Sequence, residues 1–235
     1  MAKALIVVPT YNEHENVGGI AERLLAALPK GEVLFVDDNS PDGTGALLDQ
    51  MAAKDGRIHV MHRAGKLGLG TAYIEGFHWG LARGYEFLFE MDADGSHDPK
   101  YLPTMLGLAE TGADVVVGSR YVKGGGTENW GIDRQLLSRG AGLYARTILG
   151  ISVRDVTAGF ICWRRAALEA IDLSTIGSNG YSFQIEMKYR AIKKGLRLVE
   201  TPIVFVDRRV GQSKMSRAIM VEALVKVWAL RFGRR

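Results

Sequence analysis

Short apolar runs alternate with amphipathic segments through the first half of the chain. The runs are rich in β-branched residues, which is typical of strands buried on both faces of a sheet. The segments between them repeat apolar residues at helical spacing, as Val17, Ile20 and Leu24 do. This alternation predicts an α/β domain with a mostly parallel, doubly wound sheet. Strands are expected over 3–8, 33–36, 58–61, 85–91 and 114–118, and helices over 16–28, 42–51, 70–81 and 99–109.

The second half of the chain is less regular. Gly124, Gly125 and Gly126 are typical of a mobile hinge loop, because glycine runs interrupt regular elements. Pro202 lies inside a predicted strand and indicates an edge or a bulge, since proline donates no hydrogen bond to a neighbouring strand. Helices are expected over 134–149 and 181–194, and strands over 160–163 and 196–206.

The C-terminal segment 215–232 predicts a helix that is apolar on most sides, with only a narrow polar band at Glu222 and Lys226. Such a helix must be covered on most sides. One apolar stripe can pack on the domain while the other contacts a membrane surface or a partner protein; a fully buried core helix is the alternative. The expected organisation is one domain over 1–212 and a C-terminal amphipathic helix over 213–235.

Composition narrows the function classes. The apolar and charged fractions, 47% and 24%, are those of a folded globular protein. A net charge of +4 favours anionic partners, and no nucleic-acid partner is expected. Cys162 is the only cysteine, which excludes an internal disulfide and predicts a packed core thiol. No run reaches the ~20 apolar residues of a membrane span, and no signal peptide is indicated. A cytoplasmic protein, soluble or peripheral to a membrane, is therefore expected.

Polar side chains follow the ends of four predicted strands. In a parallel α/β sheet, ligands bind beyond these ends. Asp92 and Asp94 are spaced i, i+2 after an apolar run and so share one face. Two carboxylates there suit a divalent cation bridged to phosphates, although Asp and Gly are also ordinary turn residues. The convergence favours a functional site, formed by Thr10, Tyr11, Asn12 and Glu13, by Asp37, Asp38 and Ser40, by Asp92 and Asp94, and by Ser119 and Arg120.

Ordinary dinucleotide binding is not supported. That function needs a glycine-rich turn directly after the first strand, where this chain has Pro9 to Glu13. The partial match at 68–72 follows the third strand instead, and no Walker-type phosphate loop is present.

Several motifs together resemble a known family. They read VPTYNE at 8–13, VDDNSPDGT at 36–44 and DAD at 92–94. This combination resembles the inverting family-2 glycosyltransferases with the GT-A fold, a Rossmann-like α/β domain. Within that family the chain is most similar to the polyprenol (dolichol) phosphate mannose synthases, and the similarity covers nearly the whole chain. The narrower match is supported by GLGTAY at 68–73, GSRY at 118–121, DVTAGF at 155–160 and GQSK at 211–214.

The resemblance implies a role for each matching position. Asp92 and Asp94 are expected to bind Mg²⁺ or Mn²⁺ on the donor diphosphate. Ser96 is a candidate third ligand, but related synthases often have Gln at this position, so the third ligand stays open. The nucleotide pocket is expected to contain Pro9, Tyr11 and Glu13, with Asp37 or Asp38 reading the base or ribose. The donor side is expected to include Lys66, Arg208 or Arg209, and Lys214, and the acceptor phosphate is expected to be held by Arg120, Arg134, Ser138 and Arg139.

The implied reaction moves mannose from GDP-mannose to a polyprenyl phosphate with inversion. A phosphate monoester has its second pKa near ~6 and is largely dianionic at neutral pH, so we expect no dedicated protein base. Guanidinium groups suit phosphate oxygens, although arginines over 134–146 are also typical of a solvated helix face. A membrane surface at its cytoplasmic side and a separate membrane anchor protein are expected partners.

Three alternatives remain open from the sequence. A family-2 transferase moving glucose or N-acetylglucosamine to a lipid or polysaccharide hydroxyl would need a carboxylate base, for which Asp155 is the one candidate. Asp155 could equally be an N-cap or a sugar-hydroxyl ligand. A nucleotidyltransferase and a non-catalytic regulatory subunit are the other two alternatives. Glu186 is expected to be a surface or structural residue, and His97 is not expected to bind a metal.

Overall fold

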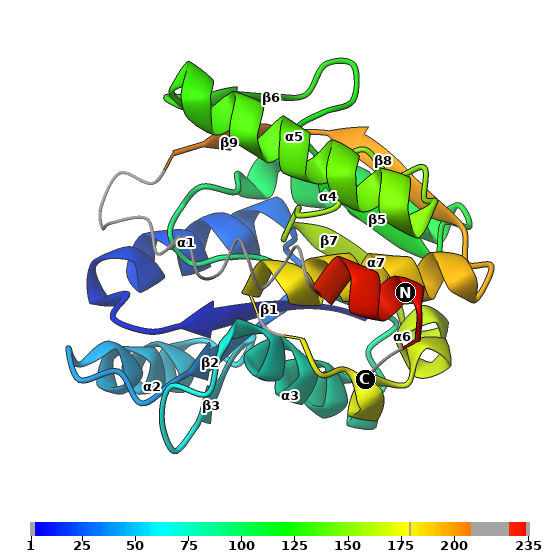
Figure 1. Ribbon diagram of the computed structural model, residues 1–235. Helices are drawn as coiled ribbons and strands as arrows, with labels where there is room; N and C mark the ends of the chain where they lie inside the picture. The colour runs from blue at the N-terminus through cyan, green and yellow to red at the C-terminus, as the bar shows by residue number, and fades with distance from the viewer. Residues whose placement is uncertain (1–2, 179, 208–225, 234–235) are drawn as a thin grey trace.

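The computed structural model describes residues 3–178, 180–207 and 226–233 of the chain. Its central feature is a sheet with helices on both faces (Figure 1). The strand order is β3-β2-β1-β4-β7-β5-β8, and every pairing is parallel except those of β7. The predicted α/β class with a mostly parallel sheet is confirmed. The strands are β1 (Ala4–Thr10), β2 (Glu32–Asp37), β3 (Ile58–His62), β4 (Phe87–Glu90), β5 (Val115–Ser119), β7 (Ile161–Arg164) and β8 (Leu198–Pro202).

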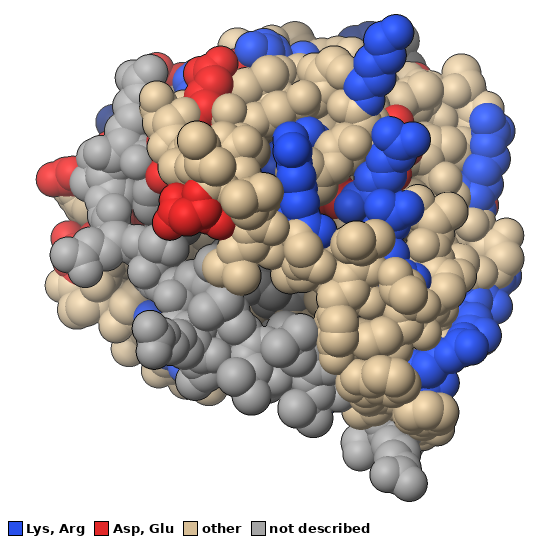
Figure 2. Space-filling model, turned by 45° about the horizontal axis from the view of Figure 1, so that its top comes forward, with Lys and Arg blue, Asp and Glu red and all other residues tan. Residues whose placement is uncertain are grey.

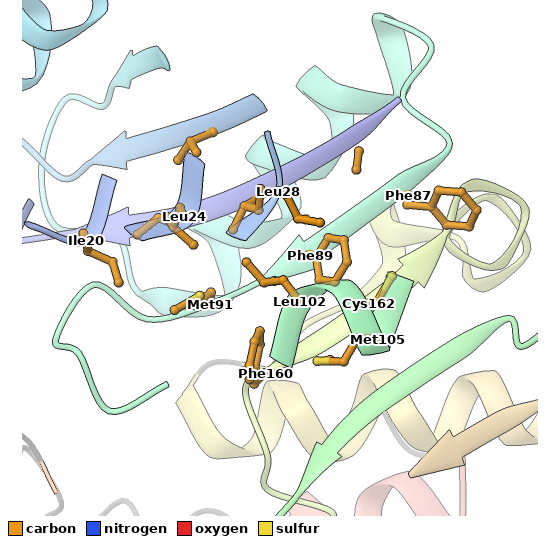
Figure 3. Packing of buried hydrophobic residues seen from close by; sticks show 14 of the residues in the cluster. Ile20, Leu24, Leu28, Phe87, Phe89, Met91, Leu102, Met105, Phe160 and Cys162 are labelled. Atoms are coloured by element: carbon orange, nitrogen blue, oxygen red, sulfur yellow. The ribbon is translucent and has the colours of Figure 1, made fainter. Parts of the chain in front are cut away.

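Two clusters of buried side chains separate the sheet from the helices on its two faces. Alternate residues of a strand point to opposite faces, so Ile6 and Val8 belong to one cluster while Leu5 and Val7 belong to the other. α1 (His14–Ala27), α2 (Thr44–Lys54) and α4 (Leu102–Glu110) pack in the first cluster, part of which Figure 3 shows. The second cluster contains α3 (Leu69–Ala82), α6 (Arg165–Ile171) and α7 (Gly180–Lys193). Short 3₁₀ turns precede α4 and α7 at η1 (Pro99–Tyr101) and η2 (Leu173–Thr175).

A second, two-stranded sheet lies under the long helix α5 (Ile132–Leu149) (Figure 1). It pairs β6 (Gly126–Glu128) with β9 (Val204–Val206). The strand predicted over 196–206 is therefore two strands, β8 in the large sheet and β9 in the small one. Pro202 ends β8, an edge strand, so the expectation of an edge is confirmed. The predicted glycine hinge is too long by one residue, because Gly126 belongs to β6.

The residues buried in the core are mostly apolar, as expected of a folded domain. Cys162 is fully buried, and burial raises the pKa of its thiol well above the usual value; the expected core thiol is confirmed. α6 was not predicted from the apolar pattern, because only three of its residues, Ala167, Leu168 and Ile171, are buried.

Most of the predicted C-terminal helix, 215–232, lies outside the described residues. Within the described part, residues 226–231 are helical. Val227 is buried in a third cluster with Ala145 and Leu149 of α5 and with Ile185 of α7. Trp228 is half exposed, and its indole N–H donates to the Tyr144 hydroxyl at 2.8 Å. One side of this segment is thus packed on the domain. Among the described helices, none has the length and apolar character needed to cross a bilayer.

Candidate active site

A cleft of about 670 Å³ lies between the carboxyl ends of the central strands and α5. Residues from four strand ends contribute to it, as the rule for parallel sheets predicts. Of the predicted site residues, the cleft is lined by Pro9, Tyr11, Glu13, Asp38, Lys66, Asp92, Asp94, Arg120, Arg134 and Ser138. Residues far apart in the sequence therefore meet in one place.

The two carboxylates after β4 accept hydrogen bonds from α3 and from their own turn. The hydroxyl of buried Tyr73 donates to Asp92 Oδ1 at 3.2 Å. The Ser96 N–H donates to Asp94 Oδ1 at 3.0 Å, and the Ser96 hydroxyl donates to the same oxygen. Gly95 has φ +75°, a left-handed conformation in which glycine avoids steric strain. The turn therefore presents both acids to the cleft.

Ser96 itself is buried and does not line the cleft. The structure shows its hydroxyl as a donor to Asp94, so it positions a carboxylate in this arrangement and is not brought to the cleft beside the acids.

The imidazole of His97 stabilises the backbone of this turn. Its Nδ1 accepts the Asp92 backbone N–H at 3.3 Å, and its ring lies against Phe160 and Phe205. Burial lowers the pKa of His97 to about 4, so the imidazole is neutral at neutral pH. An accepting Nδ1 places the proton on Nε2. This contact supports the backbone that carries Asp92, and it could not be predicted from the residue pattern.

The donor set at this turn fits a hard divalent cation. Mg²⁺ is commonly bound through one or two carboxylates, with substrate phosphates and water completing its octahedron. Asp92 and Asp94 supply two such carboxylates on one cleft wall. No group of three or more metal-binding side chains occurs in the described part of the chain.

The side of the cleft predicted to bind the nucleotide contains a buried ion pair. Arg63 Nη1 donates to Asp38 Oδ1 at 2.6 Å, and its Nη2 donates to Thr71 Oγ1 at 2.6 Å. Burial raises the pKa of Asp38, although the Arg63 charge acts in the opposite direction. Arg63 was missed from the sequence, yet it lies two residues after the end of a predicted strand, as Arg120 does.

Asp37 and Asp38 have different surroundings. Asp37 is buried, accepts from the Thr10 hydroxyl at 3.2 Å and from the Ser40 hydroxyl at 2.6 Å, and does not line the cleft. Of the two acids left open by the sequence, the structure brings Asp38 to the cleft. Lys66 lies over the Tyr11 ring at 4.2 Å and places a positive charge at the cleft wall.

One turn of α5 carries two of the residues predicted to bind the acceptor phosphate, Arg134 and Ser138. Arg134 pairs with Asp207 at 2.7 Å, and the Tyr121 hydroxyl donates to Ser138 Oγ at 2.6 Å. Arg134 and Ser138 are four residues apart, so they share one side of the helix. Arg139 does not join them. It lines a separate pocket with Arg146 and Arg154, so the expected single group of three arginines is not formed.

Arg120 lies at the wall between the two pockets and lines both. Its guanidinium donates to both carboxylate oxygens of Asp155, at 2.7 and 2.6 Å, and its backbone N–H donates to the same acid at 3.0 Å. Burial alone would raise the pKa of Asp155, but the charge and hydrogen bonds of Arg120 outweigh it and lower that pKa. Charge-assisted bidentate pairs of this kind are strong and fix both partners.

The expectations for Asp155 are corrected by this geometry. Asp155 is fully buried, does not line the cleft, and precedes a loop rather than a helix. It is therefore neither an N-cap nor positioned to touch a sugar, and as a base it would have to leave Arg120. Glu186 is also buried, bonded to Ser178 and paired with Arg190 at 2.5 Å, so its structural role is confirmed and a surface position is wrong.

A buried polar network borders the cleft, because two of its members, Gln184 and Ala158, also line the cleft. Glu90 accepts from Trp163 Nε1 at 2.6 Å and from Gln184 Nε2 at 2.5 Å. Lys188 Nζ donates to the carbonyl oxygens of Ala158 at 2.7 Å and Val156 at 3.2 Å. Burial raises the pKa of Glu90 to about 7 and lowers that of Lys188 to about 8. The network ties α7 to the loop that carries Asp155. Arg208, Arg209 and Lys214 lie outside the described residues.

Comparison with known families gives the identity of this arrangement. Residues 5–172 match the model of Glycosyl transferase family 2. The chain is a member of this family. It is therefore a glycosyltransferase, as the strand-end motifs predicted, and the nucleotidyltransferase alternative is excluded.

Two curated relatives of this family member are similar over almost the whole chain. A polyprenol monophosphomannose synthase of Mycolicibacterium smegmatis is 51% identical over 232 residues, covering 97% of this chain and 88% of the relative. An undecaprenyl-phosphate mannosyltransferase of Micrococcus luteus is 50% identical over 230 residues, covering 97% and 94%.

A solved structure shares the fold. Glucosyl-3-phosphoglycerate synthase from Mycobacterium tuberculosis, in complex with Mn²⁺, uridine diphosphate and glucosyl-3-phosphoglycerate, superposes with a TM-score of 0.69 at 18% identity. The match covers 100% of this chain and 81% of that one. At this identity the likeness establishes the GT-A fold of this glycosyltransferase and leaves its substrates to its own residues and its closer relatives.

Proposed function

We propose that the protein transfers mannose from GDP-mannose to a polyprenyl phosphate, with inversion at the anomeric carbon. The products are a polyprenyl phosphate mannose and GDP. The single observation that carries the reaction type is a cleft with a carboxylate pair, Asp92 and Asp94, on one wall and Arg134 with Ser138 on another. The two relatives at about half identity support the sugar and the acceptor class.

Asp92 and Asp94 would hold a divalent cation, Mg²⁺ or Mn²⁺. When bound, the cation supplies positive charge that stabilises the departing diphosphate. The chain's own contribution is to fix the two carboxylates before substrate arrives, through Tyr73 and His97 on Asp92 and through Ser96 on Asp94. Preorganised charge of this kind stabilises a transition state without a reorganisation cost.

The donor nucleotide would lie against the strand ends. Pro9 and Tyr11 offer surface for the base or ribose, and Asp38 offers a carboxylate acceptor whose position is fixed by Arg63. Lys66 lies on the same wall and supplies a further positive charge for a diphosphate. Arg208 or Arg209 and Lys214, which lie outside the described residues, remain proposed donor contacts from the family resemblance.

The acceptor phosphate would lie near Arg134 and Ser138. A dianionic phosphate oxygen attacks the anomeric carbon, the new carbon–oxygen bond forms, and the bond to the diphosphate breaks with its electron pair leaving on GDP. The acceptor brings no proton that must be removed, so no protein base is needed. This agrees with the burial of Asp155, the base that a hydroxyl acceptor would have required.

The protein is proposed to work at the cytoplasmic face of a membrane as a peripheral enzyme. Its acceptor is a lipid in this proposal, and the C-terminal segment 213–235 is proposed to contact that membrane or a separate anchor protein. The apolar ring of Trp228, half exposed beside exposed Phe232, supports a contact of this kind.

A panel assay tests the proposed reaction. The protein is incubated with radiolabelled GDP-mannose, UDP-glucose or UDP-N-acetylglucosamine, together with Mg²⁺ and a short prenyl phosphate, and label is followed into the organic phase. We expect label from GDP-mannose alone, and none with Asp94→Asn. Label from a UDP-sugar instead, or transfer to a prenyl alcohol in place of the phosphate, would contradict the proposal and favour the alternative family-2 transferase.

A further inference from the structure

A second pocket, of about 460 Å³, lies on the other side of Arg120 from the cleft. It is lined by the side chains of Arg139 and Arg146 from α5 and of Arg154 from the following loop. Its apolar wall comes from Tyr121 and Leu143, and none of its lining residues is acidic.

The positive charge of this pocket is not compensated within the described part of the chain. No described carboxylate forms an ion pair with the guanidinium group of Arg139, Arg146 or Arg154, and Glu200 accepts only the backbone N–H of Arg154, at 2.8 Å. By contrast, Arg120 is paired with Asp155 and Arg134 with Asp207. The Nε–H of Arg146 is buried and has no hydrogen-bond partner. Three guanidinium groups that line one hollow repel each other, and a bound anion would relieve that repulsion.

The helix phase shows what surrounds the pocket. Ile132, Leu136, Arg139, Leu143 and Arg146 are separated by four, three, four and three residues, so they form one stripe along α5. The three apolar members of that stripe are exposed, with Ile132 at 77%. Arg134 and Ser138, which line the cleft, lie on other sides of the helix. The exposed stripe thus mixes large apolar side chains with arginines.

Figure 2 shows the wider face that includes α5. Lys and Arg side chains gather on the part of this face away from the grey atoms, while most of the visible Asp and Glu lie toward the opposite edge. A basic surface with exposed leucines suits the boundary of an anionic membrane, because arginines bind phosphate headgroups while apolar side chains enter the acyl region.

We propose that this pocket binds the phosphate headgroup of an anionic membrane lipid, distinct from the acceptor. Headgroup binding would seat the exposed stripe of α5 on the membrane and bring the cleft near its lipid substrate. The proposal rests on the proposed function only in that the acceptor is taken to be a lipid.

Vesicle flotation tests the site. The protein and its Arg146→Glu/Arg154→Glu variant are mixed with phosphatidylcholine vesicles, with or without phosphatidylglycerol. We expect the parent to float only with phosphatidylglycerol and the variant to bind about tenfold or more weakly, since each basic residue near such a surface contributes to attraction. The matched control is Lys54→Glu/Lys194→Glu, which makes the same change in net charge at two exposed positions outside α5 and outside the pocket lining and should bind as the parent does.

Two further measurements separate the outcomes. Transfer to a short, soluble prenyl phosphate should be unchanged in the Arg146→Glu/Arg154→Glu variant; its loss would make the pocket part of the acceptor site and overturn the proposal. Equal vesicle binding by variant and control would also overturn it, as would binding of inorganic phosphate at the pocket without binding of anionic vesicles. If Arg146→Glu/Arg154→Glu does not fold, as judged by circular dichroism, Arg146→Gln/Arg154→Gln takes its place. Absence of all transfer by the parent would count against the proposed function and leave the vesicle result standing.

Discussion

At the scale of single residues, the acidic side chains near the cleft differ in their task. Asp92 and Asp94 line the cleft, and their positions are set by neighbours that donate hydrogen bonds. Asp155 is buried and fixed by Arg120. One set lines the cleft, and the other fixes Arg120 at the wall between two pockets. Burial and partners, not residue type, decide which acids can take part in chemistry.

Asp155→Asn should lower the free energy of unfolding by about 3 kcal/mol or more at neutral pH, because it leaves the buried guanidinium of Arg120 without its opposite charge. The pKa of Asp155 is lowered from its usual 3.8 in the folded protein. The pair therefore stabilises the fold above that pH, and its contribution is lost as pH falls through the lowered value. Denaturant titrations of the parent and of Asp155→Asn measure the loss of unfolding free energy, which should be smaller at about pH 3 than at neutral pH.

Exposed Asp133→Asn is the matched control, and its effect should stay within about 0.5 kcal/mol. A loss no larger in Asp155→Asn than in this control would show that the pair does not stabilise the wall.

At the scale of elements, the site depends on how closely α3 approaches β1. A Cβ added at Gly76 would meet Val7 Cγ1 at 2.4 Å, closer than any real contact. This glycine lets the helix lie directly on the strand, and Tyr73, one turn earlier, then reaches Asp92. The position of the carboxylate pair is thus linked to a helix–sheet distance.

Gly76→Ala should destabilise the protein by about 1–3 kcal/mol, because overpacking outweighs the better helix propensity of alanine. Gly19→Ala in α1, where nothing lies within 4 Å of the added carbon, should stabilise it by roughly 0.5–1 kcal/mol. Thermal unfolding of both variants gives the comparison. Equal effects of the two substitutions would show that the close approach is not needed.

Much of this arrangement of elements could be predicted from the apolar pattern, because strands buried on both faces leave a strong local signal. The antiparallel insertion of β7 between β4 and β5 could not, since that pairing joins segments far apart in the chain. The Arg120–Asp155 pair is hidden for the same reason. The separation of Arg139 from Arg134 could have been predicted from the sequence, because residues five apart on a helix point about 140° away from each other.

At the scale of the whole molecule, the cleft is assembled from the sheet edge, α5 and the C-terminal segment. Arg134 of α5, the two acids that follow β4, and Val227 of the described C-terminal residues all line it. Donor and acceptor would therefore join parts of the chain that meet only in the folded protein. Binding of nucleotide with its cation should consequently stabilise the whole fold.

GDP with Mn²⁺ should raise the melting temperature. At a ligand concentration a hundredfold above the dissociation constant, binding should stabilise the folded state by about 2.7 kcal/mol. The shift should disappear with a chelator and in Asp92→Asn/Asp94→Asn. It should persist in Asp98→Asn, which alters a nearby acid outside the cleft. Differential scanning fluorimetry measures all four conditions, and an unchanged shift in the double variant would count against the carboxylate pair as the cation site.

The central claim is that Asp92 and Asp94 hold a divalent cation against the donor diphosphate. Crystals grown with GDP and Mn²⁺, with data collected at the manganese absorption edge, locate that ion directly by its anomalous scattering. We expect one strong anomalous peak bonded to both carboxylates and to diphosphate oxygens. A peak elsewhere in the cleft, with neither acid bound to it, would show that the carboxylate pair is not the cation site.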